Sequence, residues 1–241
     1  MSSEETETKE VEETTPDQQL DGEEESDGSE EERQQISMEE LAEMLLSAAK
    51  EDEKSEPSLE NMRSLGLYGD VDEERISEVI AGLLTLHHLG KPKLTDEGEV
   101  KEEGKPIDMY ISTYGGSADD MASLVDIMNV VKKDCPIRTI GIGKVMSAGV
   151  LLLAAGTKGK RKIGKYCRVM IHSVVGGSHG SLPNLANEME AMQQIQKDYI
   201  DALVAETSMS KKDLKKLLER KVNVYLSAEE AVELGIADII I

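Results

Sequence analysis

The stretch that decides the fold is residues 107–156, "IDMYISTYGGSADDMASLVDIMNVVKKDCPIRTIGIGKVMSAGVLLLAAG". Apolar runs predict strands over residues 107–113 and 137–145, and helical periodicity predicts helices over 118–133 and 147–156. A turn is predicted over residues 114–117, between the first strand and the first helix. Strands that alternate with helices form βαβ units, so this stretch predicts an α/β fold with a largely parallel sheet.

The same alternation continues on both sides of this stretch. A strand over residues 65–71 and a helix over 73–90 precede it, and a polar, Gly/Pro-rich loop over 91–106 is expected between them and residue 107. The elements expected after it are a strand, a long helix, a shorter helix, and a closing helix and strand, over residues 167–175, 184–206, 210–220 and 224–240. The Ser227 and Glu230 spacing is that of a capping box at the start of the closing helix. We therefore expect a folded body over residues 61–241.

The acidic charge of the chain is concentrated near its N-terminus. The 241 residues include 49 Asp/Glu and 27 Lys/Arg, for a formal net charge of −22, and residues 1–60 hold 23 of the acids and 4 of the bases. Residues 1–36 contain almost no large apolar side chain, so they are expected to form a disordered acidic tail. The remainder is nearly neutral and has no basic stripe, which argues against nucleic-acid binding.

The sequence predicts a cytoplasmic protein that does not bind membranes. The first residues are acidic and lack the apolar core of a signal peptide. No apolar run approaches the ~20 residues of a membrane span. Two cysteines, Cys135 and Cys167, do not make a disulfide framework.

A short amphipathic helix is predicted near residues 38–50, within the acidic segment 1–60. Ser37 and Glu40 have capping-box spacing. The apolar residues that fall on one face of this helix are Met38, Leu41, Met44, Leu45 and Ala48. Two interpretations stay open: a marginal helix that frays, and a recognition peptide that docks in a groove of a partner.

Ser147 stands directly before the apolar helix and has two interpretations. A serine in this place can cap the helix, because its oxygen accepts from amides of the first turn. The same place suits a nucleophile, since the free amides there favour developing negative charge. The nucleophile-elbow pattern G-x-S-x-G is absent, because residue 145 is Val.

Two further groups lie at the predicted carboxyl ends of strands, where sites form in open α/β sheets. Gly115 and Gly116 follow the strand 107–113, and His172 lies on the strand 167–175. The glycines can be a plain turn and the histidine a buried, hydrogen-bonded one; a phosphate loop is disfavoured because neither G-x-G-x-x-G nor G-K-[ST] is present. If the three strands are neighbours, the Ser147 hydroxyl, the His172 imidazole and the glycine amides come together. Acyl transfer needs such groups as nucleophile, base and oxyanion donors.

Other histidine and cysteine residues are weaker candidates for chemistry. Cys167 and His172 are five apart on one predicted strand, so their side chains face opposite sides. His87 and His88 are adjacent on a helix and cannot bind one metal ion from one face; they are expected at a solvated helix end. We predict no metal site.

Four motifs in register resemble the ClpP family, the proteolytic subunits of the Clp protease. They are "YISTYGGSADDMASLVDIM" (110–128), "GIGKVMSAGVLLLAAGTKGKR" (141–161), "CRVMIHSVVGGSHG" (167–180) and "YLSAEEAVELGIAD" (225–238). The resemblance covers residues 63–241 and includes the 25-residue separation of Ser147 from His172. It implies a crotonase-like α/β spiral of repeated βαβ units, with residues 184–206 as a protruding handle helix.

The resemblance also implies roles for individual residues. Ser147 matches the nucleophile, His172 the general base, and the amides of Gly116 and Ala148 the oxyanion hole. The residues that match the segment pairing with an extended substrate are Val174, Val175, Gly176 and Gly177. The function implied is a serine endopeptidase that cleaves unfolded polypeptides, with no metal or other cofactor on this subunit.

The family's partners are implied as well. Its members form homo-oligomers, two heptameric rings stacked as a tetradecamer around an inner chamber. An AAA+ unfoldase feeds polypeptides into the chamber, and the ATP is used by that partner.

Two departures from the family pattern qualify these expectations. Asn223 stands where the family has the Asp of the triad, and a neutral amide orients an imidazole without adding charge, so weak or conditional activity is expected. The family's axial loop is not recognisable, and the loop over residues 90–106 is longer than usual, so docking of an ordinary unfoldase is in doubt. A divergent paralogue or a virus-encoded protease acting on capsid proteins, in the host cytoplasm, fits these changes.

Two rival functions remain for the same scaffold. One is a ClpP-like ring subunit without activity, which mixes into rings and modulates them. The other is a crotonase-fold acyl-CoA enzyme, against which the pairing of Ser147 with His172 speaks.

Overall fold

The computed structural model describes residue 43 and residues 62–218 and 223–241. The chain divides into two units, residues 1–56 and 57–241, and the description below concerns the second. The disordered tail predicted over residues 1–36 and, apart from Glu43, the amphipathic helix predicted near 38–50 lie outside the described residues.

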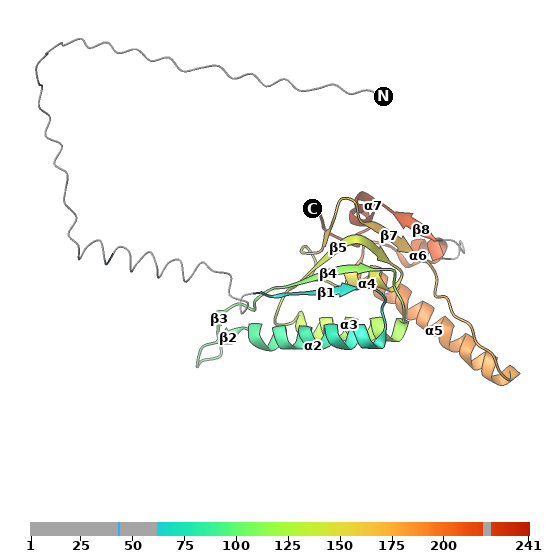
Figure 1. Cartoon of the computed structure of the whole chain (residues 1–241), viewed down its shortest axis with the longest axis horizontal. Coiled ribbons are helices and arrows are strands. Elements are labelled where there is room, and N and C mark those ends of the chain that lie inside the picture. The colour runs from blue at the N-terminus through green and yellow to red at the C-terminus, as the bar shows by residue number, and fades with distance from the viewer. Residues whose placement is uncertain (1–42, 44–61, 219–222) are drawn as a thin grey trace, which may run out of the picture. The chain divides into compact units, whose positions relative to one another are not determined.

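A seven-stranded, mostly parallel sheet forms the centre of the second unit (Figure 1). Its main path runs through β1 (Ser64–Tyr68), β4 (Ile107–Thr113), β5 (Ile137–Met146), β6 (Lys162–Ile163) and β9 (Ile239–Ile240). Off this path, β7 (Arg168–Ile171) pairs with β5, and β8 (Val224–Leu226) pairs with β7. The β7–β8 pair is antiparallel and the other pairs of this sheet are parallel, so the predicted α/β class is confirmed.

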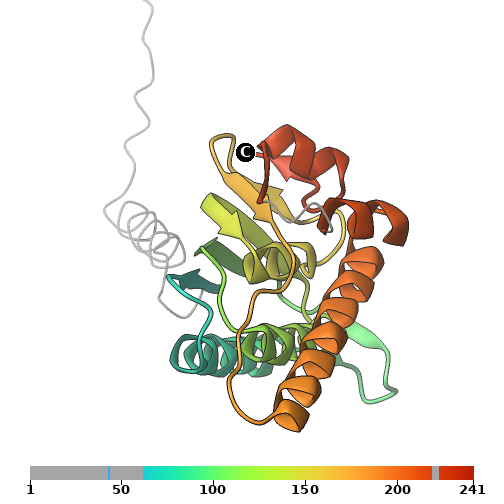
Figure 2. The same cartoon turned by 90° about the vertical axis from the view of Figure 1, so that its right-hand side faces the viewer.

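Six helices are described around this sheet. They are α2 (Glu73–Gly90), α3 (Ala118–Val131), α4 (Ala148–Ala154), α5 (Leu182–Glu206), α6 (Lys211–Leu218) and α7 (Ala228–Glu233). In Figure 1, α2 and α3 lie side by side beneath β1 and β4, while one end of α5 projects from the body. Figure 2, turned by 90°, shows the whole length of α5 along one side of the molecule, as expected for the predicted handle helix.

The burial pattern explains this layering. Along β4 the residues alternate between buried and half-buried, with Ile107, Met109, Ile111 and Thr113 on the buried face. All seven residues of α4 are buried, as expected for a helix that is apolar on every side. The apolar run after Ser147 is therefore a central core helix.

The long strand β5 pairs with two different strands on one side. Its middle, Ile140 and Gly141, pairs with β6, and its last residues, Lys144 to Met146, pair with β7. Its other edge pairs with β4 over most of its length. The carboxyl ends of β4, β5 and β7 therefore lie next to one another.

A buried arginine joins three elements at the other end of α4. Arg161, with 4% of its surface exposed, donates through Nε to Asp238 Oδ2 (2.9 Å) and through Nη2 to Asp238 Oδ1 (2.5 Å). Its Nη1 donates to the carbonyls of Ala154 (3.1 Å) and Glu206 (2.6 Å), at the ends of α4 and α5. Burial works to raise the pKa of Asp238, but the hydrogen bonds and charge of Arg161 outweigh it, and the pKa is lowered.

Local signals at the helix starts are also observed. Asp72 accepts from the Arg75 amide before α2, and Ser117 accepts from the Asp120 amide before α3. The capping box predicted at Ser227 and Glu230 is confirmed in both of its hydrogen bonds.

Four expectations about local structure are corrected. The segment 91–106 contains a small antiparallel hairpin, β2 (Lys93–Leu94) with β3 (Val100–Glu102), where an unstructured loop was predicted. The strand predicted over 167–175 ends at Ile171, and the short strands β6 and β8 were not predicted. These strands are two to four residues long, so pairing with neighbours defines them and local pattern does not.

The interpretation of His87 as a solvated residue is wrong. Its side chain is buried, and its Nε2 lies 2.7 Å from Oδ2 of Asp134, because α2 packs against the end of α3. His88, one residue later, is exposed, as expected. Within the described ranges, no helix is long and apolar enough to cross a bilayer.

Candidate active site

The carboxyl ends of three neighbouring strands bring the predicted site residues together. Val145 of β5 pairs with Thr113 of β4 on one side and with Val169 of β7 on the other. The residues that follow each of these positions along the chain lead to Gly115 and Gly116, to Ser147, and to His172. The adjacency on which the acyl-transfer hypothesis depends is therefore present.

The backbone at Ser147 makes a sharp turn from strand to helix. Its φ of 53° and ψ of −122° make it the single non-glycine residue with positive φ among the residues described. Its amide donates to the carbonyl of Met170 (2.8 Å), and its hydroxyl makes no capping hydrogen bond to α4. This is the conformation of a nucleophile elbow without the G-x-S-x-G pattern, and the helix-cap interpretation is not supported.

Two glycines make this turn possible by leaving room around it. A Cβ on Gly115, whose φ is 101°, would lie 2.5 Å from the Cβ of Ser147. A Cβ on Gly149 would lie 2.5 Å from Cγ2 of Thr113. A side chain at either position would push the serine turn away from β4.

A cavity of about 380 Å³ opens over this turn, and the predicted groups share it. Ser147, Ala148, Gly116 and His172 all line it. The side chains of Ser147 and His172 are half-buried. No hydrogen bond joins the Ser147 hydroxyl to the His172 ring in the part of the chain that is described, although catalytic hydrogen bonds are often longer without substrate.

The two predicted oxyanion donors belong to residues that line this cavity, and their amides have no acceptor among the described residues. Within the described ranges, neither the amide of Gly116 nor that of Ala148 donates to another protein atom. Gly116 has a φ of 152°, and a Cβ there would lie 2.2 Å from the carbonyl oxygen of Val71. Free amides beside a hydroxyl can stabilise a tetrahedral oxyanion.

Asn223 is placed by the register of the β7–β8 ladder. Ile171 pairs with Val224 in the antiparallel direction, so the next residues along the two strands are His172 and Asn223. Asn223 is exposed, and in the described structure it neither lines the cavity nor makes a hydrogen bond to His172. The topology brings it to the chain position next to His172, which is 51 residues away in sequence.

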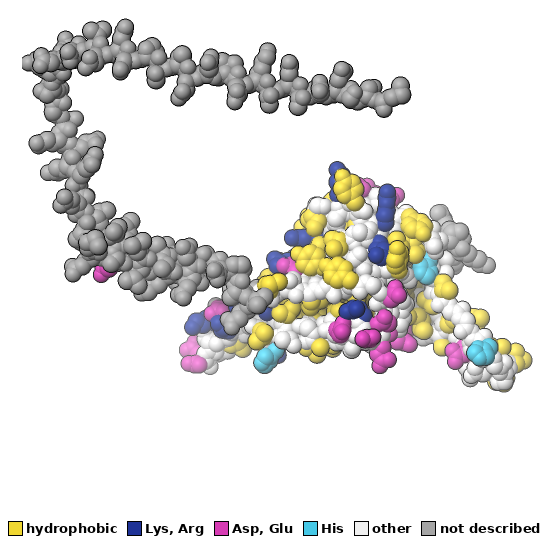
Figure 3. Space-filling view, viewed as in Figure 1, with side chains coloured by type: hydrophobic (Ala, Val, Ile, Leu, Met, Phe, Trp, Pro, Cys, Tyr) yellow, Lys and Arg dark blue, Asp and Glu magenta, His cyan; other side chains and the backbone are white. Residues whose placement is uncertain are grey.

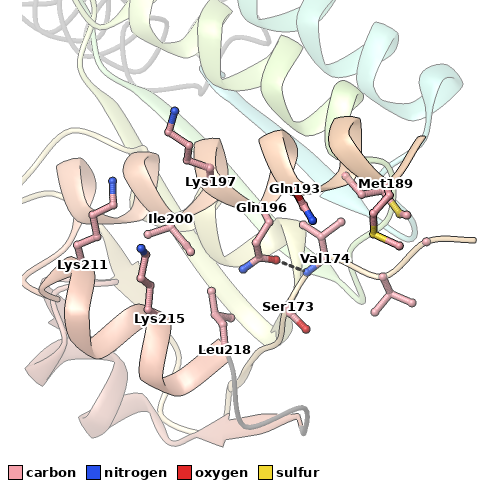
Figure 4. A pocket seen from close by; sticks show the side chains of 13 residues that line it. Ser173, Val174, Met189, Gln193, Gln196, Lys197, Ile200, Lys211, Lys215 and Leu218 are labelled. Carbon is pink, nitrogen blue, oxygen red and sulfur yellow. Dashed lines mark hydrogen bonds between the residues drawn. The ribbon is translucent and has the colours of Figure 1, made fainter. Parts of the chain in front are cut away.

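The segment expected to pair with substrate is not a regular strand. Val174 and Val175 line the cavity, whereas Gly176 and Gly177 do not. The amide of Val174 donates to Oε1 of Gln196 at 2.6 Å, a contact drawn in Figure 4. Any substrate strand must therefore pair through other backbone groups of this segment.

Sequence reasoning did not identify two residues of α5 that hold this site. The hydroxyl of Tyr199 donates to the carbonyl of Ser147 (3.1 Å), and Gln196 holds Val174. Complete burial raises the pKa of Tyr199, so it remains a phenol donor. The available signal was weak: Tyr199 is one of many apolar residues of this helix, and the half-buried Gln196 resembles its other polar residues.

Both cysteines are unsuited to nucleophilic chemistry. Cys167 is buried, and desolvation raises its pKa to about 11. Cys135 is fully buried, and burial raises its pKa as well. Thiolate is the reactive form of cysteine, so neither side chain is activated at neutral pH.

Comparison with known proteins decides the family. The sequence matches the Clp protease family over residues 47–241. The chain belongs to the Clp protease family. The resemblance and the ClpP-like α/β fold predicted from it are thereby confirmed, and the family makes the chain a peptidase subunit of the Clp type.

Three relatives named as Clp proteolytic subunits are similar over most of their length. The chain is 32% identical to the "ATP-dependent Clp protease proteolytic subunit 1" of Prochlorococcus marinus (strain MIT 9312), over 74% of this chain and 84% of the relative. It is 34% identical to the protein of the same name in Prochlorococcus marinus subsp. pastoris, over 74% and 83%. The "ATP-dependent Clp protease proteolytic subunit" of Borreliella afzelii is 31% identical, over 73% and 81%.

Proposed function

We propose that this Clp-family chain is a serine endopeptidase that uses Ser147 as nucleophile and His172 as general base. One observation carries the proposal. Ser147 sits on a positive-φ turn with its hydroxyl free of capping, in the same cavity as His172 and the free amides of Gly116 and Ala148.

The proposed reaction proceeds through an acyl-enzyme. Oγ of Ser147 attacks the carbonyl carbon of the substrate peptide bond while the imidazole of His172 takes the hydroxyl proton. The carbonyl oxygen becomes an oxyanion that accepts from the amides of Gly116 and Ala148. Collapse of this intermediate breaks the C–N bond, and His172 returns the proton to the leaving amine. Water then attacks the acyl-enzyme while His172 takes its proton. The acyl group leaves as a carboxylic acid, and His172 returns the proton to Oγ of Ser147.

Asn223 is proposed as the residue that orients His172. Its side-chain carbonyl can accept from the second imidazole nitrogen but contributes no negative charge to stabilise the imidazolium. Reduced or conditional turnover follows from this neutral partner.

Changing Asn223 to Asp tests this role. We expect kcat of peptide hydrolysis to rise at least about tenfold, because in a serine protease the reverse exchange lowers turnover by about 10⁴. The measurement is steady-state hydrolysis of a fluorogenic peptide across pH 5–9, with Asn223→Ala as the matched control. An Asp variant no faster than the parent, together with an unimpaired Ala variant, means that another group orients the imidazole.

The proposed assembly follows the family. The chain forms homo-oligomeric heptameric rings stacked as a tetradecamer, and polypeptides are cleaved in the inner chamber. It needs no cofactor of its own, and an AAA+ unfoldase in the cytoplasm uses the ATP. The names of the similar relatives, which describe them as ATP-dependent, support such a partner.

Active-site labelling combined with mass photometry tests the proposed function. A fluorophosphonate probe should form one covalent adduct per chain, located at Ser147 by peptide mass spectrometry and absent from Ser147→Ala. Mass photometry of the same sample should report ring assemblies. Rings that take up no probe instead indicate the inactive ring subunit that the Asn223 departure also fits. Labelling at another residue refutes the assignment of the nucleophile.

A further inference from the structure

A second hollow adjoins the active-site cavity. It has a volume of about 830 Å³ and lies between α5, α6 and the segment 173–176 (Figure 4). Ser173, Val174 and Val175 line both hollows. A polypeptide that follows this segment from Ser147 therefore reaches the second hollow directly. We call it the lysine groove, for the side chains described next.

The lining of the lysine groove combines apolar and basic groups. Its apolar residues include Met189, Met192, Ile200 and Leu218. Its charged lining residues are three lysines, Lys197, Lys211 and Lys215, and in the described structure no carboxylate lines it. In Figure 4, Ile200 and Leu218 lie between the helices, and the three lysine side chains extend in the same general direction from α5 and α6. This local positive charge stands out in a chain whose formal net charge is −22.

Two of the three lysines make no direct ion pair in the described structure, although both lie close enough to Asp201 to help lower the pKa of its carboxyl. Lys211 forms an ion pair with Asp201, and this hydrogen bond lowers the pKa of Asp201, which keeps the pair charged. Lys197 and Lys215 have no ion-pair partner within 4.0 Å among the described residues. The groove therefore presents two unpaired positive charges beside apolar surface.

The sequence of α6 explains the arrangement. In "KKDLKKLL" the apolar Leu214 and Leu218 are buried against the body, which turns the lysines outward. Lys211 and Lys215 are four residues apart and share the face that lines the groove. Lys212 and Lys216 are equally exposed but do not line it.

We infer that the lysine groove binds acidic segments of polypeptide substrates and makes the peptidase selective for carboxylates near the cleaved bond. The inference rests on the proposed function for its catalytic consequence. Carboxylates of the substrate pair with Lys197 and Lys215, while apolar side chains next to them pack on the methionine and isoleucine surface. Partly exposed pairs of this kind contribute modestly and weaken with salt, so the selectivity is electrostatic and salt-dependent.

Charge reversal in the groove, with a matched reversal outside it, tests the inference. The variants are Lys197→Glu/Lys215→Glu and the control Lys212→Glu/Lys216→Glu, which change the net charge equally. The probes are two fluorogenic peptides that differ only in Glu or Gln on either side of the same apolar cleavage site. The wild-type assembly should cleave the Glu peptide with a kcat/KM about three- to tenfold higher than the Gln peptide, the range expected for two partly exposed ion pairs.

The groove variant should lose or reverse this preference, whereas the control should keep it, and 0.5 M NaCl should reduce it in the wild type. Equal kcat/KM for both peptides in the wild type, or a preference that survives in the groove variant, overturns the inference. Thermal unfolding of all variants confirms that these exposed substitutions leave the fold intact.

A binding measurement separates this inference from the proposed function. Fluorescence anisotropy with the Ser147→Ala chain and labelled Glu and Gln peptides reports affinity without any turnover. If the wild type cleaves neither peptide, the serine peptidase proposal fails, but the measured affinities still test whether the lysine groove binds acidic peptides. The inference about the lysine groove is supported if the Glu peptide binds more tightly than the Gln peptide and Lys197→Glu/Lys215→Glu removes this difference. Equal affinities for the two peptides refute it.

Discussion

The Ser147→Ala chain is expected to hydrolyse peptides at least about 10³-fold more slowly than the wild type, because loss of a catalytic serine removes most of the rate enhancement. The residual rate comes from the amides of Gly116 and Ala148 and from substrate binding. Steady-state hydrolysis of a fluorogenic peptide by the assembled chain measures it. Ser123→Ala, on the exposed face of α3, is the matched control and should retain wild-type activity.

A double-mutant cycle makes this prediction sharper. His172→Ala should cost a similar factor, and the Ser147→Ala/His172→Ala chain should be no slower than either single variant, since a nucleophile and its base act as a unit. Losses that multiply would mean that the two residues act independently. Full activity of Ser147→Ala would place the nucleophile elsewhere.

The Arg161→Ala substitution has the largest expected effect on stability. It leaves the Asp238 carboxylate partly buried without its counter-charge and leaves the carbonyls of Ala154 and Glu206 without their donor. Removal of one partner of a buried ion pair costs about 3–5 kcal/mol. We expect the free energy of unfolding, measured by urea denaturation, to fall by about this amount.

The Asp108–Arg138 pair provides the control for this prediction. It has the same bidentate geometry, but the Arg138 side chain is 36% exposed and the Asp108 side chain 26% exposed. Arg138→Ala should therefore cost no more than about 1 kcal/mol. Equal losses for the two arginine variants would show that the burial of Arg161 adds nothing.

At acid pH, the free energy of unfolding should depend on the titration of Asp238. Its pKa is lowered in the folded chain, so the unfolded chain binds more protons as the pH falls towards the ordinary value of 3.8. The stabilisation is fully present above that value and is lost as the pH falls through the lowered folded pKa. In Asp238→Asn, the acid-side slope of unfolding free energy against pH should be shallower than in the wild type.

Long periodic elements of this fold could be predicted from sequence, and short ones could not. The helix over residues 73–90 and the strand over 107–113 were predicted with the bounds that the structure shows, because capping residues and alternating burial define them locally. The hairpin β2–β3 and the strands β6 and β8 depend on neighbours far away in sequence. His87 was misjudged for the same reason, since its partner Asp134 comes from the turn after another helix, α3.

The candidate site divides in a similar way. Ser147 and His172 could be proposed from their places at strand ends and from the family motifs. The turn at Ser147 lacks the expected local pattern, because Gly115, in the turn after the neighbouring strand β4, supplies part of the space that the usual motif provides nearby. Gln196 and Tyr199 could not be identified, because their contacts exist only after α5 packs on the sheet.

The two contacts from α5 have a mechanical consequence. Gln196 and Tyr199 lie three positions apart, on the same side of one helical turn. Gln196 accepts from the amide of Val174, two residues beyond His172, and Tyr199 donates to the carbonyl of Ser147, the proposed nucleophile. Because both contacts come from one turn of α5, the turn at Ser147 and the segment after His172 are expected to move together when this part of the helix tilts. The distance between the Ser147 hydroxyl and the His172 ring is therefore expected to change little when α5 bends elsewhere.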